Sequence, residues 1–249
     1  MATTTQEGLL ERDKPALGVR HTMLVLVSPR AVFARVEDTG AYGWALVMLL
    51  GLFVLIGYAQ VHTGLIDADV DRQTEQKRAK IEEAQGNLID RVQLRDRMEK
   101  ITKEGEFHRL IMRLLVIGVS PAFMLASFLF IASVLYAVVA LTGRKPEYHS
   151  LMSICVYSGF IELVGYLLRF AMMLYYRTTE VHTSLAALGT PGEPSVWAAI
   201  DPFRIWFWVL VAIGLTVTRQ LSRRMAVVSC SLMCLLTLGA RVALEYTLK

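Results

Sequence analysis

Five apolar runs, each long enough to cross a lipid bilayer, take up most of this chain. They lie at Trp44–Ile66, Leu110–Ala140, Leu151–Leu174, Phe203–Thr218 and Met225–Leu248. A membrane-spanning helix needs roughly 20 mostly apolar residues, because each residue adds about 1.5 Å of rise. The fourth run is the shortest, but Trp206 and Trp208 at its start are typical of a membrane interface. The sequence therefore predicts an all-α fold: a polytopic membrane protein with five transmembrane helices.

The composition of the 249-residue chain agrees with a membrane protein. Hydrophobic residues make up 54% and charged residues 19%, against roughly 25% charged residues in soluble domains. Since so little of the chain lies outside the apolar runs, we expect one bundle and no second, soluble core. The net charge of +4 is modest, and its basic residues are concentrated in short loops. This pattern predicts membrane lipid, and no nucleic acid, as a partner.

The positions of Lys and Arg in the short loops predict the orientation of the spans. The loop after the second run carries Arg144 and Lys145, and the turn at residues 219–224 carries three arginines. The segment before the first run is also basic, whereas residues 175–200 carry one basic residue, Arg177. These sets alternate as expected for a cytoplasmic N-terminus and a C-terminus on the outer side. The long segment after the first run then lies outside the cytoplasm, because long loops translocate largely regardless of charge.

The chain is predicted to divide at residue 41. Residues 1–41 are expected to form a cytoplasmic N-terminal segment, and residues 42–249 the five-helix transmembrane domain. Near the end of the first segment, Ser28 is suited to cap a helix and Pro29 to occupy its first position. A short interfacial helix is predicted here by three apolar residues that share one face, namely Val32, Phe33 and Val36.

A charged segment between the first two runs, Asp67–Phe107, is rich in helix-forming residues and contains no proline. A breaker near its middle, Gly86-Asn87, separates two arms. Each arm carries a series of residues at alternating spacings of four and three, which is typical of a heptad seam. The series are Val70, Thr74, Lys77, Ile81 and Ala84, and then Leu94, Met98, Ile101, Gly105, His108 and Met112. Two such arms predict an antiparallel helical hairpin that projects from the membrane.

The predicted hairpin suits the docking of a partner protein, because its outer faces remain charged. The residues assigned to this docking hairpin are Val70, Ile81, Gly86, Leu94, Met98 and Ile101. Because the seam contains Lys77 and Gly105, it is imperfect. The alternatives are a single exposed helix or a helix that lies on the lipid surface.

A candidate polar site lies within the third apolar run. Glu162 and Arg169 are seven residues apart, so one helix face carries both. An ionisable group in hydrocarbon costs roughly 2.5–3.5 kcal/mol and normally faces protein or water. The functional interpretation is an intramembrane polar site that also includes Tyr157, Ser158 and Tyr166. The alternative is a structural contact between helices, with Arg169 reaching towards the interface.

Motifs for catalysis or for cofactor binding are missing from the sequence. The five histidines are dispersed, without an HExxH pair, and there is no Walker loop, GxSxG elbow or GxGxxG fingerprint. Cys155, Cys230 and Cys234 all fall within apolar runs, which favours packing over metal ligation or redox chemistry. We therefore expect no enzyme activity, no cofactor and no metal site.

Several stretches together resemble the Yip family, five-span membrane proteins related to the Rab-interacting Yip proteins of eukaryotes. They are Ser28-Pro-Arg-Ala-Val-Phe, Tyr157-Ser158, Asp201-Pro-Phe-Arg-Ile-Trp-Phe-Trp-Val-Leu-Val-Ala-Ile-Gly214 and Ser222-Arg-Arg224. The resemblance covers residues 28–60 and 110–246. It implies five spans and a cytosolic N-terminus, and it supplies no catalytic residues.

Two departures from the eukaryotic relatives favour a bacterial member and count against Rab binding. The segment before the first span is short, and the charged insertion is foreign to their compact loops. Bacterial relatives are similar to accessory partners of ABC exporters with periplasmic adaptor subunits. The expected function is therefore a non-enzymatic scaffold or accessory subunit in a bacterial inner-membrane complex, with an ABC transporter permease and a periplasmic adaptor as partners. The alternative is a small lipid or solute transporter that uses Glu162 and Arg169.

Overall fold

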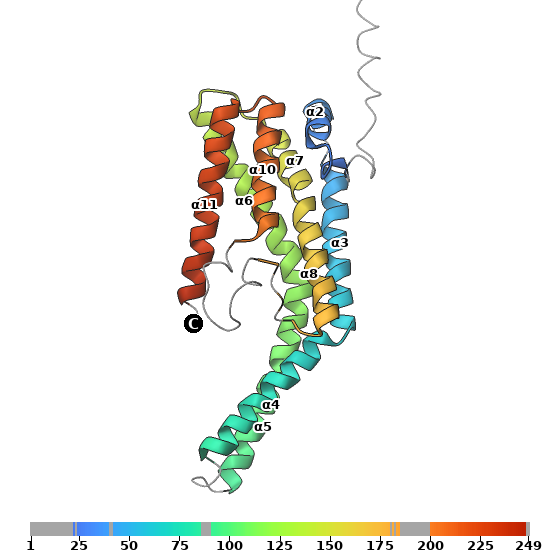
Figure 1. Cartoon of the computed structure of the whole chain (residues 1–249), viewed down its shortest axis with the longest axis vertical. Coiled ribbons are helices and arrows are strands. Elements are labelled where there is room, and N and C mark those ends of the chain that lie inside the picture. Colours follow the sequence, from blue (N-terminus) through green and yellow to red (C-terminus); the bar gives the residue numbers. More distant parts are fainter. Residues whose placement is uncertain are drawn as a thin grey trace, which may run out of the picture. The chain divides into compact units, whose positions relative to one another are not determined.

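The chain is helical in the computed structural model shown in Figure 1. The structure describes residues 22, 24–39, 42–85, 91–179, 181, 183–184 and 200–247, and these contain no β-strand. The helices are α2 (Pro29–Thr39), α3 (Gly43–His62), α4 (Leu65–Gln85), α5 (Arg91–Leu114), the π-helical turn η1 (Leu115–Val119), α6 (Ser120–Leu141), α7 (Tyr148–Ser158), α8 (Phe160–Tyr176), α10 (Pro202–Val217) and α11 (Arg223–Thr247). The predicted all-α class is confirmed.

Four helical stretches of the described residues are long and apolar enough to cross a membrane. They are Gly43–His62, Arg95–Leu141, Tyr148–Tyr176 and Arg223–Ala243, and the shorter apolar helix Pro202–Val217 accompanies them. A polytopic helical membrane protein is therefore confirmed. The first span ends at His62, four residues before the predicted end at Ile66. Gly64, with φ of +70°, lies in the turn that follows it, and a glycine adopts this backbone conformation without steric cost.

The third predicted span contains a break that the apolar pattern did not reveal. The helix is interrupted at Gly159, between α7 and α8. The Gly159 N–H donates to the carbonyl oxygens of Cys155, at 2.9 Å, and Val156, at 3.1 Å. A Cβ at this position would lie 2.4 Å from Phe128 Cζ and 3.0 Å from Leu49 Cδ2. A larger residue here would require the ends of the Phe128 and Leu49 side chains to shift.

The long helix that contains the second span changes geometry before Pro121. Proline has no N–H and so removes one hydrogen bond from the preceding turn. Leu115–Val119 form a π-helical turn, in which the Ser120 N–H donates to the carbonyl of Leu115. The Ser120 Oγ donates to the same carbonyl at 2.9 Å. The helix thus contains a π-helical turn directly on the N-terminal side of Pro121.

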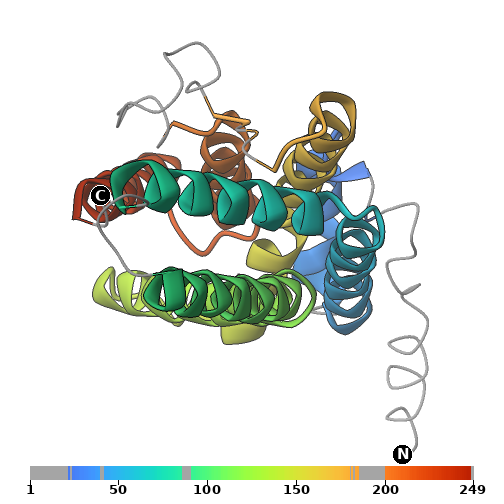
Figure 2. The same cartoon turned by 90° about the horizontal axis from the view of Figure 1, so that it is seen from below.

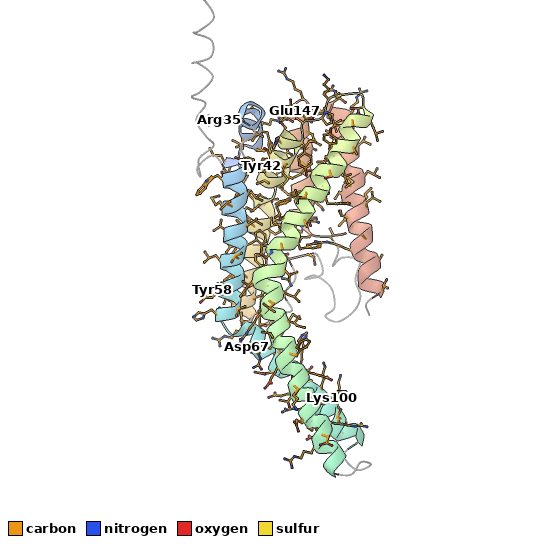
Figure 3. The ribbon with its side chains drawn as sticks, turned by 180° about the vertical axis from the view of Figure 1, so that it is seen from behind. Arg35, Tyr42, Tyr58, Asp67, Lys100 and Glu147 are labelled. Atoms are coloured by element: carbon orange, nitrogen blue, oxygen red, sulfur yellow. The ribbon has the colours of Figure 1, made fainter. Side chains whose placement is uncertain are left out.

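The contacts divide the chain into two compact units. The first unit is formed by Met1–Leu49, Leu125–Gly165 and His182–Lys249, and the second by Leu50–Met124 and Tyr166–Val181. In the first unit α10 contacts α2, α7 and α11, and Figure 1 shows α10 and α11 side by side. Figure 3 places Arg35 and Glu147 at the same end of this unit. Its core contains large buried side chains from several of these helices, among them Phe33, Tyr157, Phe160, Phe207 and Leu210.

The helix predicted to lie at the membrane interface, α2, buries its apolar face within the first unit. Val32, Phe33 and Val36 are at most 2% exposed, and α2 contacts α7 and α10. These three side chains therefore face protein and not lipid headgroups. The placement of α2 near the cytoplasmic surface stays a prediction.

In the second unit α4 and α5 lie next to each other (Figures 1 and 2). Figure 1 shows that they extend beyond the ends of α3 and α8. Closer to α3, the backbones come into near contact. A Cβ at Gly57 would lie 2.7 Å from the carbonyl oxygen of Val116. The small residue therefore brings α3 directly against the π-helical turn.

Candidate functional site

The hairpin formed by α4 and α5 is antiparallel, and its cross-helix contacts fix its register. Asp67 pairs with Arg113 at 2.6 Å, and Asp71 pairs with Arg109. Further along, the Arg78 guanidinium donates to the Thr102 hydroxyl. In each contact the two residue numbers add up to 180, which is the signature of two arms that run in opposite directions. Figure 3 places Asp67 at the base of the hairpin and Lys100 towards its turn.

The seam between the two arms is more polar than the heptad pattern predicts. Val70 is 5% exposed, and Ile81, Met98 and Ile101 are partly buried. Lys77, however, is exposed, and the neighbouring Arg78 reaches across to Thr102 of the facing arm. The long Arg78 side chain reaches across because its guanidinium finds a hydroxyl acceptor on the facing arm. Gly86 lies outside the described residues, as does the side chain of Leu94.

A small void remains inside this hairpin. It has a volume of about 280 Å³ and is lined by Val70, Thr74, Ile101, Gly105 and His108, among others. A Cβ on Gly105 would lie 2.8 Å from the Thr74 hydroxyl oxygen, so the two arms touch closely at this point. Beside this contact, the void marks a place where side chains do not fill the space between the arms.

The two charged residues of the predicted intramembrane site have different environments. Glu162, in the first turn of α8, forms an ion pair with Arg204 of α10 at 2.5 Å. Both side chains are mostly buried, with 23% and 19% of their surface exposed, and the Arg204 guanidinium lies 6.0 Å from the centre of the Phe207 ring. This contact belongs to the first unit. It is an interhelical ion pair, of the kind that the structural alternative predicted.

A capping motif in the sequence indicates the position of Arg204, which the spacing of Glu162 and Arg169 does not reveal. Asp201 and Pro202 begin α10, and the Asp201 carboxylate accepts a hydrogen bond from the Phe203 N–H at 2.9 Å. This capping fixes where the helix starts and so places Arg204 in its first turn. A cation in the first turn of an apolar helix needs an anionic partner, and Glu162 is that partner.

Arg169 belongs to the second unit, where it lines a cavity of about 300 Å³. The polar residues of this lining include Gln60, Asp69, Tyr166, Arg169 and Thr179. We call it the Arg169 cavity. Of the predicted polar-site residues it contains Arg169 and Tyr166, whereas Tyr157 and Ser158 are buried in the first unit, at 1% and 0% exposed.

Two hydrogen-bond donors of the Arg169 cavity lack acceptors among the described residues. They are the Nε of Arg169 and the Nε2 of Gln60, both buried. Gln60 is 5% exposed, and its Oε1 accepts a hydrogen bond from the Tyr166 hydroxyl at 3.2 Å. The Tyr166 ring stacks on Phe53 with 4.9 Å between ring centres, so this hydroxyl is held in place. Buried donors normally have partners, and oxygen atoms are the acceptors that these two donors match.

The acidic residue of the cavity lining, Asp69, already has hydrogen-bond and ionic partners. Asp69 is 7% exposed; its carboxylate accepts from the Thr179 hydroxyl and lies 3.6 Å from an Arg72 nitrogen. The free donors therefore come from Arg169 and Gln60, which suits a small molecule with oxygen acceptors. No group of three or more His, Cys, Asp or Glu that could hold a metal ion occurs among the described residues.

Comparisons with known proteins identify the family. Residues 23–244 match the profile of the Yip1 domain. No curated protein and no solved structure shows significant similarity to the chain. The match covers nearly all of the described helices, including the charged hairpin and the Arg169 cavity, so the chain belongs to the Yip1-domain family of membrane proteins.

Proposed function

We propose that this protein is a non-enzymatic scaffold or accessory subunit of a bacterial inner-membrane complex, of the ABC-exporter type with a permease and a periplasmic adaptor. The observation that carries the proposal is the α4–α5 hairpin. It extends beyond the ends of α3 and α8, its outer side chains such as Lys100 and Lys103 are exposed, and its seam contains a void. A thin, charged helical pair gains burial by docking on another protein.

The proposal places the N-terminus in the cytoplasm and both the hairpin and the C-terminus in the periplasm. The distribution of Lys and Arg in the short loops supports this orientation. A background without Cys155, Cys230 and Cys234 allows a test with single cysteines at two exposed lysines, Lys100 and Lys145. A membrane-impermeant thiol reagent added to whole cells should label Lys100→Cys but not Lys145→Cys. The opposite labelling would overturn the orientation.

The docking role can be tested by shortening the hairpin without disturbing its base. Deletion of residues 79–85 together with residues 95–101 removes two helical turns from each arm. Because the register sum is 180, the pairs at Asp67, Asp71 and Arg78 keep their partners. Partner proteins identified with the full chain in mild detergent should then be lost, while the amount of inserted protein stays the same. Unchanged co-purification would refute hairpin docking.

A second function is favoured by the Arg169 cavity: transport of a small solute or lipid. The two unpaired buried donors, Arg169 Nε and Gln60 Nε2, are the observation behind it. In this case the purified chain alone should catalyse uptake into liposomes, and Arg169→Gln should abolish uptake without loss of folded protein. Co-purification of stable subunits, with no uptake by the lone chain, supports the scaffold.

A further inference from the structure

A long groove runs along the first unit between α10 and α11. Its volume is about 760 Å³, within the roughly 300–1,000 Å³ range of small-molecule sites. Residues of its lining recur every three or four positions on each helix, so each helix contributes one continuous face. On α10 these are Ile205, Trp208, Val209, Ala212, Ile213, Thr216 and Val217, and on α11 Val227, Cys230, Ser231, Cys234, Leu235 and Leu238.

The groove has a buried floor and an open rim. Trp208 and Cys230 are 2% and 3% exposed, whereas Val209, Val227 and Leu235 of the same lining are exposed. From Ile205 to Val217 the groove extends about 18 Å along α10, at the helical rise of about 1.5 Å per residue. That length is similar to half of a hydrocarbon core about 30 Å thick. An acyl chain of one leaflet therefore fits its length and its chemistry.

One end of the groove is positively charged. Arg30, from the first turn of α2, and Arg223, the first residue of α11, both contribute to its lining. Both arginines are exposed, and neither pairs with a carboxylate in the described part of the chain. The N-terminal ends of two helices add partial positive charge in the same place. Two guanidinium groups above an apolar groove are complementary to a phosphate that is attached to acyl chains.

We propose that this groove binds one anionic phospholipid, whose phosphate contacts Arg30 and Arg223 and whose acyl chain lies between α10 and α11. The site lies in the first unit, apart from the docking hairpin and the Arg169 cavity of the second unit, so it does not depend on either proposed function. Bound lipid fills the groove between the two helices and ties α2 to α11 through a shared phosphate. The basic end of the fourth and fifth spans thus acts as a headgroup site as well as a topology signal.

The experiment measures lipid retained by the purified full chain. The protein is delipidated in mild detergent and offered phosphatidylglycerol or phosphatidylcholine with identical acyl chains, and native mass spectrometry counts the bound lipid. The wild type should retain one phosphatidylglycerol in preference to phosphatidylcholine. One basic residue near an anionic lipid is worth about fivefold in affinity, so R30Q/R223Q should lose roughly thirtyfold. R224Q is the control, since Arg224 is equally exposed but is not part of the lining.

A second pair of variants tests the acyl chain. Ala212→Phe places a large side chain in the groove and should displace the lipid, whereas Val228→Phe, at an exposed position of α11 outside the lining, should not. Three results would overturn the proposal: equal retention of the two lipids, a preference that survives R30Q/R223Q, or retention unaffected by Ala212→Phe. Displacement of the lipid by equimolar inorganic phosphate would show a free-anion site instead. A concentration-dependent dimer that excludes lipid would assign the groove to a second copy.

Discussion

The contact of α7 with α10 in the first unit and the contact at the base of the hairpin use different chemistry. Where α7 meets α10, a Cβ on Gly214 would lie 2.6 Å from Ile154 Cγ2, and the surrounding side chains are buried. Where α4 meets α5, by contrast, the contacts at the base are ion pairs of Asp67 with Arg113 and of Asp71 with Arg109. One contact depends on close approach and the other on charge.

This difference follows from what surrounds each pair of helices. Between apolar helices in lipid there is no hydrophobic driving force, so association relies on small residues that allow close packing. The hairpin has few apolar side chains to bury, and the base of its two arms is aligned by paired charges, each worth little by itself. The first unit is therefore expected to be rigid, and the hairpin to be adaptable and sensitive to salt.

The largest expected effect comes from filling the close contact in the first unit. Gly214→Leu forces a side chain into Ile154 and should cost about 3 kcal/mol or more, measured as a loss of thermal stability in detergent. Gly239→Leu in α11 is the control, because a Cβ there meets nothing within 4 Å. If both variants melt alike, close packing does not decide the stability of this unit.

A smaller effect is expected from the ion pair within the same unit. Glu162→Gln removes the charge that faces Arg204 and should cost about 2 kcal/mol, because both side chains are largely buried. Arg169→Gln should leave the thermal stability nearly unchanged, since the Arg169 Nε has no acceptor to lose. Equal losses for the two variants would contradict the separation of these residues into a structural pair and a cavity.

How far the sequence anticipates these features depends on the length of the pattern behind each one. Whole helices are predicted by long patterns, such as runs of about 20 apolar residues or heptad series over three turns. For this reason both α3 and the α4–α5 hairpin were predicted from the sequence. The break at Gly159 was missed, and so were the neighbours that restrict side-chain size there, Phe128 and Leu49, because they are distant in the sequence. The polar site was predicted on one helix face, Glu162 with Arg169. The spacing within α8 contains no information on Arg204, which pairs with Glu162, or on Gln60, which lines the same cavity as Arg169.

The base of the hairpin should respond to charge and to salt. Asp67→Arg places a cation beside Arg109 and Arg113, and it should weaken the pairing by about 1 kcal/mol, since these side chains are about a third exposed. The combination Asp67→Arg with Arg113→Asp should recover part of the loss. Hydrogen exchange of α4 measures both effects, which should shrink as salt rises. No recovery in the double variant would argue against the observed register.

The smallest effect is expected at an exposed pair further along the hairpin, Glu99 and Lys103 of α5, which lie 2.8 Å apart. The hydrogen bond that the Lys103 ammonium donates to the Glu99 carboxylate lowers the pKa of Glu99 and raises the pKa of Lys103. The contribution of Glu99 is therefore present above its ordinary pKa of 4.5 and is lost as pH falls through the lowered value. That of Lys103 is present below 10.5 and is lost as pH rises through the raised value. Because both groups are fully exposed, water and salt screen the pair.

Glu99→Gln should thus leave hydrogen exchange of α5 unchanged at neutral pH, where Asp67→Arg alters that of α4. An equally large change in the Glu99 variant would show that exposed charges along the arm, and not only those at its base, hold the hairpin together.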